Sequence, residues 1–386
     1  MSPADASSDP HTSSGQQASS DLQSRLTASD RPGVAQPVPV RPIPAQPWLR
    51  ILTGAAILFA LLLGSWDAYW RAFGMTPQTQ NSNGLWAIQR RRIDNGEGDA
   101  TVFTGASRVF FDMQLDVWEK LDGKRPIQLA WEGTSPVYII EDLAADENFK
   151  GHLLIGIAPD LAFTGFGIHR GAPRYAHDES PAQRVGQWLS MHFVEPVFAF
   201  DDPDFALATV LKRQAWPARP GKTWNTAVRK LAVTEPDRNT HIWDKVENDP
   251  EYKALARQIW AEEFVPSDDD PTPEVAKKTT KEQIDRIVKA VAKMQARGVK
   301  VLFLRPPSTG PFLENENRHF PRKETWDVLL AATGAPGIHF EDYPELQGLE
   351  LPEWSHLSYA DARKFTAAVH AIVVRDFWPR EVIDVN

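Results

Sequence analysis

The chain has 386 residues, with 42 Lys and Arg against 51 Asp and Glu, and therefore a formal net charge of −9. This balance argues against a nucleic-acid partner, because phosphate binding needs clustered positive charge. There are no cysteines, which excludes disulfides, thiolate metal sites and thiol catalysis. The 14 Trp residues are unusually many. Such rings suit membrane interfaces and sugar-facing surfaces, although most Trp packs in cores.

The first segment, residues 1–47, is rich in Pro and Ser and contains no aromatic residue. It cannot bury enough apolar surface to offset the entropy that ordering it would lose. We expect a disordered tail.

An uncharged apolar run, ILTGAAILFALLLGSW, follows at residues 51–66. Sixteen helical residues span about 24 Å, slightly less than a hydrocarbon core of about 30 Å. Arg50 and Asp67 can snorkel, and Trp and Tyr residues flank the run on both sides. We therefore expect a single transmembrane anchor over residues 48–72.

Two alternatives to an anchor are a buried core helix and the apolar region of a cleaved signal peptide. The polar residues before the run and the bulky WDAYWR after it disfavour a signal peptide. Basic residues lie on both sides of the span, so the positive-inside rule does not decide its orientation. Our working expectation is an anchor in the inner (cytoplasmic) membrane, with the C-terminal domain facing the periplasm or exterior.

Beyond residue 95, short apolar runs alternate with helical periods, which is typical of α/β proteins with a mostly parallel sheet. The expected strands are 101–104, 127–131, 153–158, 299–304 and 338–340. An amphipathic helix should precede the fourth strand, capped by Thr279 or Thr280 and stopped at Gly298. Ser358 and Asp361 should open a C-terminal helix. Between about 160 and 275 the strand signals become sparse, which indicates a helical insertion in a domain over 73–386.

A serine follows the first expected strand directly. Gly105-Ala106-Ser107-Arg108 leads into VFFDMQLDVWEKL, which has the pattern of a helix. Open α/β sheets bind their ligands at this kind of turn, so Ser107 is a candidate nucleophile. The alternative is that Ser107 is only a helix N-cap, a position that serine favours.

A histidine lies about 250 residues later, in Glu353-Trp354-Ser355-His356, just before the C-terminal helix. A neutral imidazole there can accept the proton of Ser107, and Glu353 can hold the ring in the required tautomer. This hypothesis expects Ser107 Oγ within about 2.6 to 3.2 Å of the His356 ring. A lone histidine in a loop is usually a surface residue. The hypothesis therefore depends on Ser107 and His356 together.

Together these elements resemble the SGNH (GDSL-type) hydrolases. The likeness covers residues 100–160 and 298–378 and is nearest to the membrane-anchored branch of cell-envelope polysaccharide O-acetyltransferases and acetylesterases. It implies a three-layer α/β/α sandwich and a triad of Ser107, His356 and Glu353. It also implies an oxyanion hole made by the backbone N–H groups of Ser107 and Gly133. Arg108, directly after the serine, would be a substrate-binding residue, as that branch often has Arg there.

Two positions depart from the family pattern. The acid is Glu353 where the family usually has Asp, and Ala158 stands where the third strand typically ends in Gly-x-Asn. Loss of one oxyanion donor lowers rates by about 100 to 1,000-fold in other enzymes. Arg305, at the end of the fourth strand, could replace that donor or bind an acidic sugar. Its alternative role is a structural ion pair.

The remaining histidines do not indicate a metal site. The spacing of His169, His177 and Asp178 matches no compact zinc pattern, and we expect neither a metal nor another cofactor. We therefore expect a membrane-anchored serine acyl-ester hydrolase or O-acyltransferase acting on an envelope or extracellular glycan. The alternative is a non-catalytic glycan-binding or scaffold protein of the same fold, which would partner a membrane acyl-transfer complex.

Overall fold

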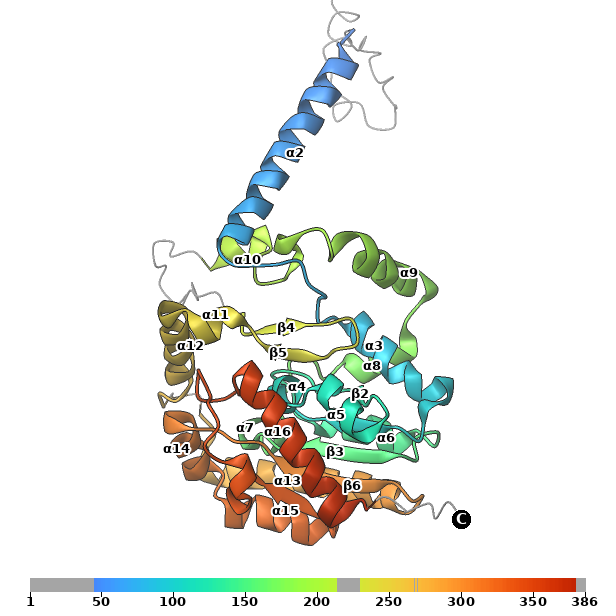
Figure 1. Ribbon diagram of the computed structural model, residues 1–386, viewed down its shortest axis with the longest axis vertical. Helices are drawn as coiled ribbons and strands as arrows, with labels where there is room; N and C mark the ends of the chain where they lie inside the picture. Colours follow the sequence, from blue (N-terminus) through green and yellow to red (C-terminus); the bar gives the residue numbers. More distant parts are fainter. Residues whose placement is uncertain (1–44, 214–229, 267, 269, 380–386) are drawn as a thin grey trace, which may run out of the picture. The chain divides into compact units, whose positions relative to one another are not determined.

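The computed structural model of the protein describes residues 45–213, 230–266, 268 and 270–379 (Figure 1). Its contacts divide the chain into two units, residues 1–61 and 62–386. The expected tail lies outside the described residues except for its last three, which begin at Ala45.

The apolar run forms helix α2, Trp48–Ala72, which is long and apolar enough to cross a membrane. Its 25 residues span about 37 Å, more than a hydrocarbon core of about 30 Å. Its most apolar 18-residue window has a mean hydropathy of 1.8, and none of that window is buried. A core helix is mostly buried, so this exposure favours a membrane anchor over the alternative of a buried core helix.

A five-stranded parallel sheet, ordered β2-β1-β3-β6-β7, forms the centre of the larger unit. All five expected strands are present, and they differ from the expectation only at their ends. Their bounds are β1 Thr101–Thr104, β2 Ile127–Gln128, β3 His152–Gly156, β6 Lys300–Arg305 and β7 Gly337–His339.

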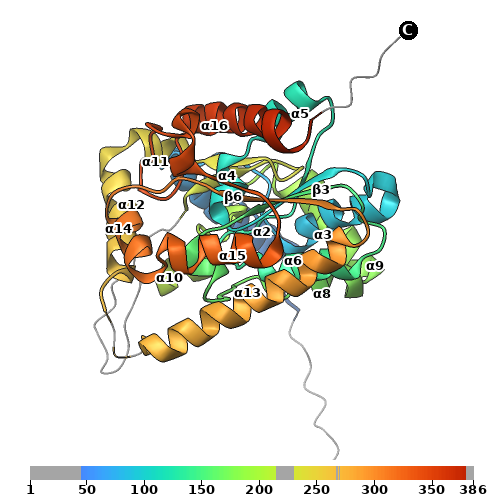
Figure 2. The same cartoon turned by 90° about the horizontal axis from the view of Figure 1, so that it is seen from below.

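Helices cover both faces of this sheet. Successive strand residues point to opposite sides, so Leu153 and Ile155 enter one apolar core and Leu154 enters the other. Figure 2 shows α13 and α16 on opposite sides of β6. The first face carries α3 Asn83–Arg92, α6 Val137–Ala145, α13 Pro273–Gln295 and α15 Trp326–Thr333; the second carries α4 Ser107–Asp112, α5 Leu115–Asp122 and α16 Tyr359–Ile372.

The helix ends agree only partly with the sequence pattern. The Ser358 side chain caps α16 by accepting from the Asp361 N–H, as expected. Helix α13 begins earlier than expected, because Thr272 caps it and Pro273 occupies its first turn. The helix expected after Ser107 is two helices, because the backbone between them is extended and the Gln114 N–H donates to Thr366 Oγ1 (2.8 Å).

The described residues of the segment 160–275 are mostly helical, and they also form an unexpected antiparallel hairpin, β4 Ala232–Thr234 and β5 Thr240–Ile242. Its helices are α7 Pro159–Ala162, α8 Ala172–Asp178, α9 Pro181–Leu189, α10 Leu207–Lys212, α11 Asp244–Asn248 and α12 Pro250–Glu263, with one π-helical turn, η3 Ser190–Val194. Helix α14, Gly310–His319, follows β6.

The strand order creates a crevice beside β1. The chain leaves β1 for β2 on one side and then crosses to β3 on the other, and open α/β sheets bind ligands at such a reversal. The turn after β1 packs closely on β3: a side chain at Gly105, whose φ is +153°, would approach the Gly156 Cα to 3.1 Å. This close packing places Ser107 at the carboxyl end of the sheet.

Candidate active site

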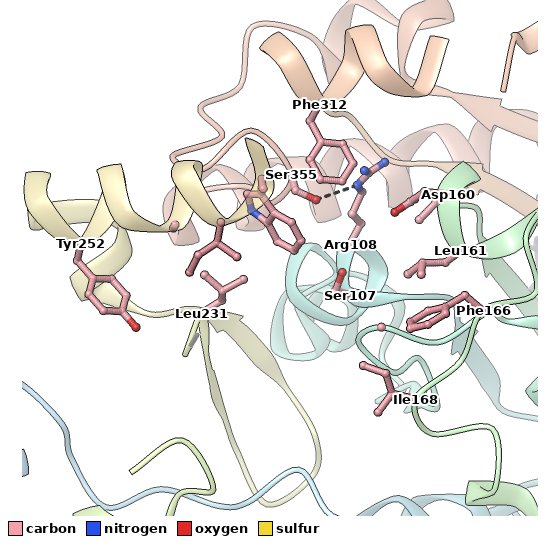
Figure 3. Close-up of a pocket in the computed structure, with 15 residues that line it drawn as sticks. Ser107, Arg108, Asp160, Leu161, Phe166, Ile168, Leu231, Tyr252, Phe312 and Ser355 are labelled. Atoms are coloured by element: carbon pink, nitrogen blue, oxygen red, sulfur yellow. Dashed lines mark hydrogen bonds between the residues drawn. The ribbon is translucent and has the colours of Figure 1, made fainter. Parts of the chain in front are cut away.

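A cavity of about 440 Å³ opens at this end of the sheet. Ser107, Gly133, Ala158 and Asp160 line it from the segments after β1, β2 and β3 (Figure 3). Tyr252, Ala256, Ile259 and Trp260 of α12 line another part of the same cavity. The helical insertion therefore contributes an apolar part of the candidate site, which the resemblance to a family did not cover.

Ser107 is the first residue of α4, and its side chain reaches the cavity. The N-cap is Ala106, and no side-chain cap bond is formed, so the alternative in which Ser107 serves only as a cap does not hold. Within the described part of the chain, the backbone N–H groups of Ser107 and Gly133 have no hydrogen-bond partner. Both residues line the cavity, so both donors are available for the oxyanion role that the resemblance implies.

Glu353 and His356 form a buried pair, as expected from their spacing. The His356 Nδ1 lies 2.8 Å from Glu353 Oε1, and the His356 backbone N–H donates to the same oxygen at 2.6 Å. The other carboxylate oxygen accepts from the Trp260 indole N–H. Glu353 is fully buried and His356 is 1% exposed. The carboxylate is therefore held by three donors, and its position sets the orientation of the imidazole.

The far nitrogen of the ring, His356 Nε2, is buried and has no hydrogen-bond partner among the described residues. The expected hydrogen bond from Ser107 Oγ to this ring is thus not formed in the structure. Ser355, which precedes His356 in the chain, lines the same cavity as Ser107. The fold brings the two distant loops to one crevice, but contact between the serine and the imidazole stays a prediction; such contacts often tighten only with substrate bound.

The loop that carries the histidine is pinned in a strained conformation. Trp354 has a φ of +76°, which is rare for a bulky side chain. Its carbonyl accepts from the Thr309 N–H (2.9 Å), and its ring lies beneath the Arg257 guanidinium at 5.5 Å. Strained residues of this kind persist only where the surroundings determine them, and they cluster at functional sites.

A second carboxylate, Asp112 of α4, is fully buried beside this loop and was missed in the sequence. Its Oδ1 accepts from the Leu357 N–H at 3.0 Å, while its Oδ2 has no partner in the described chain. Burial raises the pKa of Asp112 well above its usual value, which favours the neutral acid. The available signal was an acidic residue within the apolar run VFFD.

Arg108 lines the cavity and is held by a buried charge network. Its guanidinium pairs with Glu316 Oε1 at 2.8 Å, donates to Ser355 Oγ at 3.3 Å and lies 4.8 Å from the Phe312 ring centre (Figure 3). Its remaining nitrogen, Nη1, is buried without a partner among the described residues. Asp160, opposite it in Figure 3, has an unpartnered Oδ1, and burial raises its pKa. Two residues that line the cavity therefore each keep one buried polar atom without a partner in the described chain, a donor on Arg108 and an acceptor on Asp160.

Arg305 belongs to the same network, and its contacts bear on the two roles that the sequence left open. It is 4% exposed, pairs with Glu316 Oε2 at 2.8 Å and also donates to Ser308 Oγ. The same Glu316 oxygen accepts from Ser308 Oγ at 2.6 Å. These contacts favour the structural ion pair over substrate binding. Arg108 is the arginine of this network that lines the cavity.

Comparison with known proteins adds no family assignment, since no protein-family model matches the chain and a search of curated proteins finds no match. The likeness to the SGNH hydrolases therefore rests on the residues and loops described above.

Proposed function

We propose that the protein is a membrane-anchored serine acyl-ester hydrolase or O-acyltransferase of the SGNH type. The observation that carries this proposal is the buried Glu353–His356 pair, with its far ring nitrogen unpartnered, in a loop that shares a cavity with Ser107. In the proposed reaction, Ser107 Oγ attacks the ester carbonyl carbon while His356 takes its proton. The proton then passes to the leaving alkoxide, and Glu353 keeps the ring oriented.

The developing oxyanion would be held by the N–H groups of Ser107 and Gly133. Ala158 offers no side-chain donor at the position where the family has Asn. Arg108 lines the same cavity and its buried Nη1 has no partner among the described residues, so this side chain is the donor that we propose in its place. The acyl-enzyme is then released to water in a hydrolase, or to a sugar hydroxyl in a transferase, depending on how far the pocket excludes water.

The proposed substrate is an acylated glycan of the cell envelope or extracellular space. A second cavity of about 340 Å³ shares Ile168 with the first and is lined by Tyr175 and by polar Asn83, Arg174 and Asp178. Amide, guanidinium and carboxylate groups hydrogen-bond hydroxyls well. A chain of sugars could therefore occupy the second cavity while its ester lies at Ser107.

Localisation follows from α2 in this proposal. We propose an anchor in the inner membrane with the α/β domain on the periplasmic or outer side. A C-terminal fusion to a phosphatase that is active only outside the cytoplasm should be active. An inactive but stably expressed fusion would reverse the orientation and leave the chemistry at Ser107 untouched.

The proposed chemistry is tested with the full chain in detergent, by following hydrolysis of an aryl acetate with and without sugar acceptors. We expect the wild type to hydrolyse the ester. Ser107→Ala should abolish this turnover, whereas Ser355→Ala, which alters the other serine that lines the cavity, should not. Products acylated on the sugar would identify a transferase. Turnover equal in the wild type and Ser107→Ala would refute the proposed nucleophile.

The non-catalytic alternative is favoured by Ala158 and by the missing Ser107–His356 hydrogen bond. In that case the same cavities would bind a glycan for a membrane acyl-transfer complex. Glycan binding that survives Ser107→Ala, combined with no turnover of any ester, would support it.

A further inference from the structure

The helix α9 and the turn η3 carry an apolar stripe that faces away from the domain. Val185, Trp188, Leu189 and Phe193 recur at helical spacing and are 57%, 52%, 45% and 60% exposed. No residue of α9 is buried. An amphipathic surface helix normally turns its apolar side to the core, so this arrangement is reversed.

The opposite, polar side of the same segment contacts the domain. Gln187 Oε1 accepts from Ser82 Oγ at 2.8 Å, next to the start of α3. Just after η3, buried Glu195 accepts from the Gln80 N–H at 3.1 Å. These polar contacts fix the rotation of the segment and keep its apolar stripe outward.

The end of this segment is fastened to the last turns of α2. Asp67 Oδ1 accepts from the Ala199 N–H at 2.7 Å, and the Arg71 guanidinium donates to the Val197 carbonyl at 2.6 Å. Trp70 packs on Phe205 with ring centres 4.5 Å apart. Figure 1 shows α9 and α10 on the side of the domain where residues 67–72 of α2 enter it.

The position of this attachment indicates what covers the stripe. Asp67 is the first charged residue after the apolar run of α2, and Tyr69, which is exposed, and Trp66, which is partly exposed, lie beside it in the helix, as at a lipid–water boundary. A segment bonded to residues 67 and 71 therefore lies at that boundary.

We propose that α9 and η3 lie in the interfacial plane of the bilayer that α2 crosses, with Trp188, Leu189 and Phe193 inserted among the lipids. The 14 residues form a rod of about 21 Å, suited to an interfacial amphipathic helix. Leu207 and Leu211 of α10, 56% and 47% exposed, extend the contact. A second contact with the bilayer would hold the cavity at a fixed height above the membrane surface. The inference rests on the membrane anchoring proposed above and is independent of the chemistry at Ser107.

Spin labels can test this directly, because the chain contains no cysteine and a single introduced one gives a unique site. The full chain is reconstituted in phosphatidylcholine liposomes with a nitroxide at Leu189→Cys or Phe193→Cys. Accessibility to oxygen, which concentrates in lipid, is compared with accessibility to a water-soluble nickel chelate. Val328→Cys on α15, 43% exposed, is the matched apolar control, and Leu58→Cys reports insertion of α2.

We expect the oxygen-to-nickel ratio at Leu189 and Phe193 to exceed that at Val328 severalfold, with the highest ratio at Leu58. A lipid signal at Leu58 with aqueous signals at Leu189 and Phe193 would overturn the inference and leave the anchor intact, and a protein partner would then be the occupant of the stripe. An aqueous signal at Leu58 would overturn both the inference and the anchor. Neither result would bear on ester hydrolysis.

Discussion

Replacement of Glu353 by Gln perturbs the candidate triad with the smallest change in shape. The carboxylate accepts from the His356 backbone N–H, from His356 Nδ1 and from the Trp260 indole. A Gln amide has one accepting oxygen and one NH₂ group that donates. The oxygen can accept either from the Trp260 indole or from the two His356 donors, and the NH₂ group then faces the other side. At least one buried donor then loses its acceptor, which costs about 1 to 3 kcal/mol of stability.

The effect on catalysis should be larger than the effect on stability. Loss of the orienting acid lowers kcat by about 10⁴-fold in a serine protease, or about 5.5 kcal/mol of transition-state stabilisation. We expect Glu353→Gln to lower aryl acetate turnover by about 10³ to 10⁴-fold while remaining folded by circular dichroism. Trp260→Phe, which removes one donor and keeps the carboxylate, is the matched control and should lose much less activity. Glu353→Gln with turnover within about threefold of the wild type would refute the orienting role.

Three further predictions test the surroundings of the site. Ala158→Asn restores the side-chain donor of the family and should raise ester turnover by about tenfold or more, since one donor is worth about 100-fold or more elsewhere; unchanged turnover would show that no donor is missing. Glu316→Leu leaves Arg108 and Arg305 buried without a carboxylate and should lower the free energy of unfolding by about 3 to 5 kcal/mol; a change below about 1 kcal/mol in urea unfolding would contradict this. Burial and two neighbouring guanidinium groups lower the pKa of His339 to about 3, against about 6.5 in an unfolded chain. Between these two values the unfolded chain binds a proton that the folded protein does not. The stability that neutral His339 contributes is therefore complete above pH 6.5 and is lost as the pH falls toward 3, by up to about 1.4 kcal/mol per pH unit. The stability difference between the wild type and His339→Asn should change between pH 7 and 4, and a constant difference would refute the assignment.

The sheet and the approximate position of the candidate site were accessible from sequence because they depend on local patterns. Short apolar runs followed by turn residues identified all five strands of the parallel sheet. The ends of parallel strands meet at one edge, so Ser107 could be expected in a crevice there. The three-residue spacing of Glu353 and His356 was sufficient to predict their contact.

The supporting contacts were not accessible because they join residues far apart in the chain. Arg108 pairs with Glu316 across more than 200 residues, and the Glu353 carboxylate needs the Trp260 donor from the insertion. Nothing in the local pattern of a helix reveals such a partner. Arg305 had two open roles for a different reason: Glu316 is only 11 residues away, but their contact depends on how the chain turns between β6 and α14, which the local pattern does not specify.

The central claim is that Ser107 is a nucleophile activated by His356, and covalent labelling of the full chain tests it most directly. The wild type is treated with a fluorophosphonate, and the adduct is located by peptide mass spectrometry. We expect one adduct on Ser107, formed much more slowly in His356→Asn and absent in Ser107→Ala. No adduct on folded wild-type protein, or an adduct on Ser355 instead, would contradict the account.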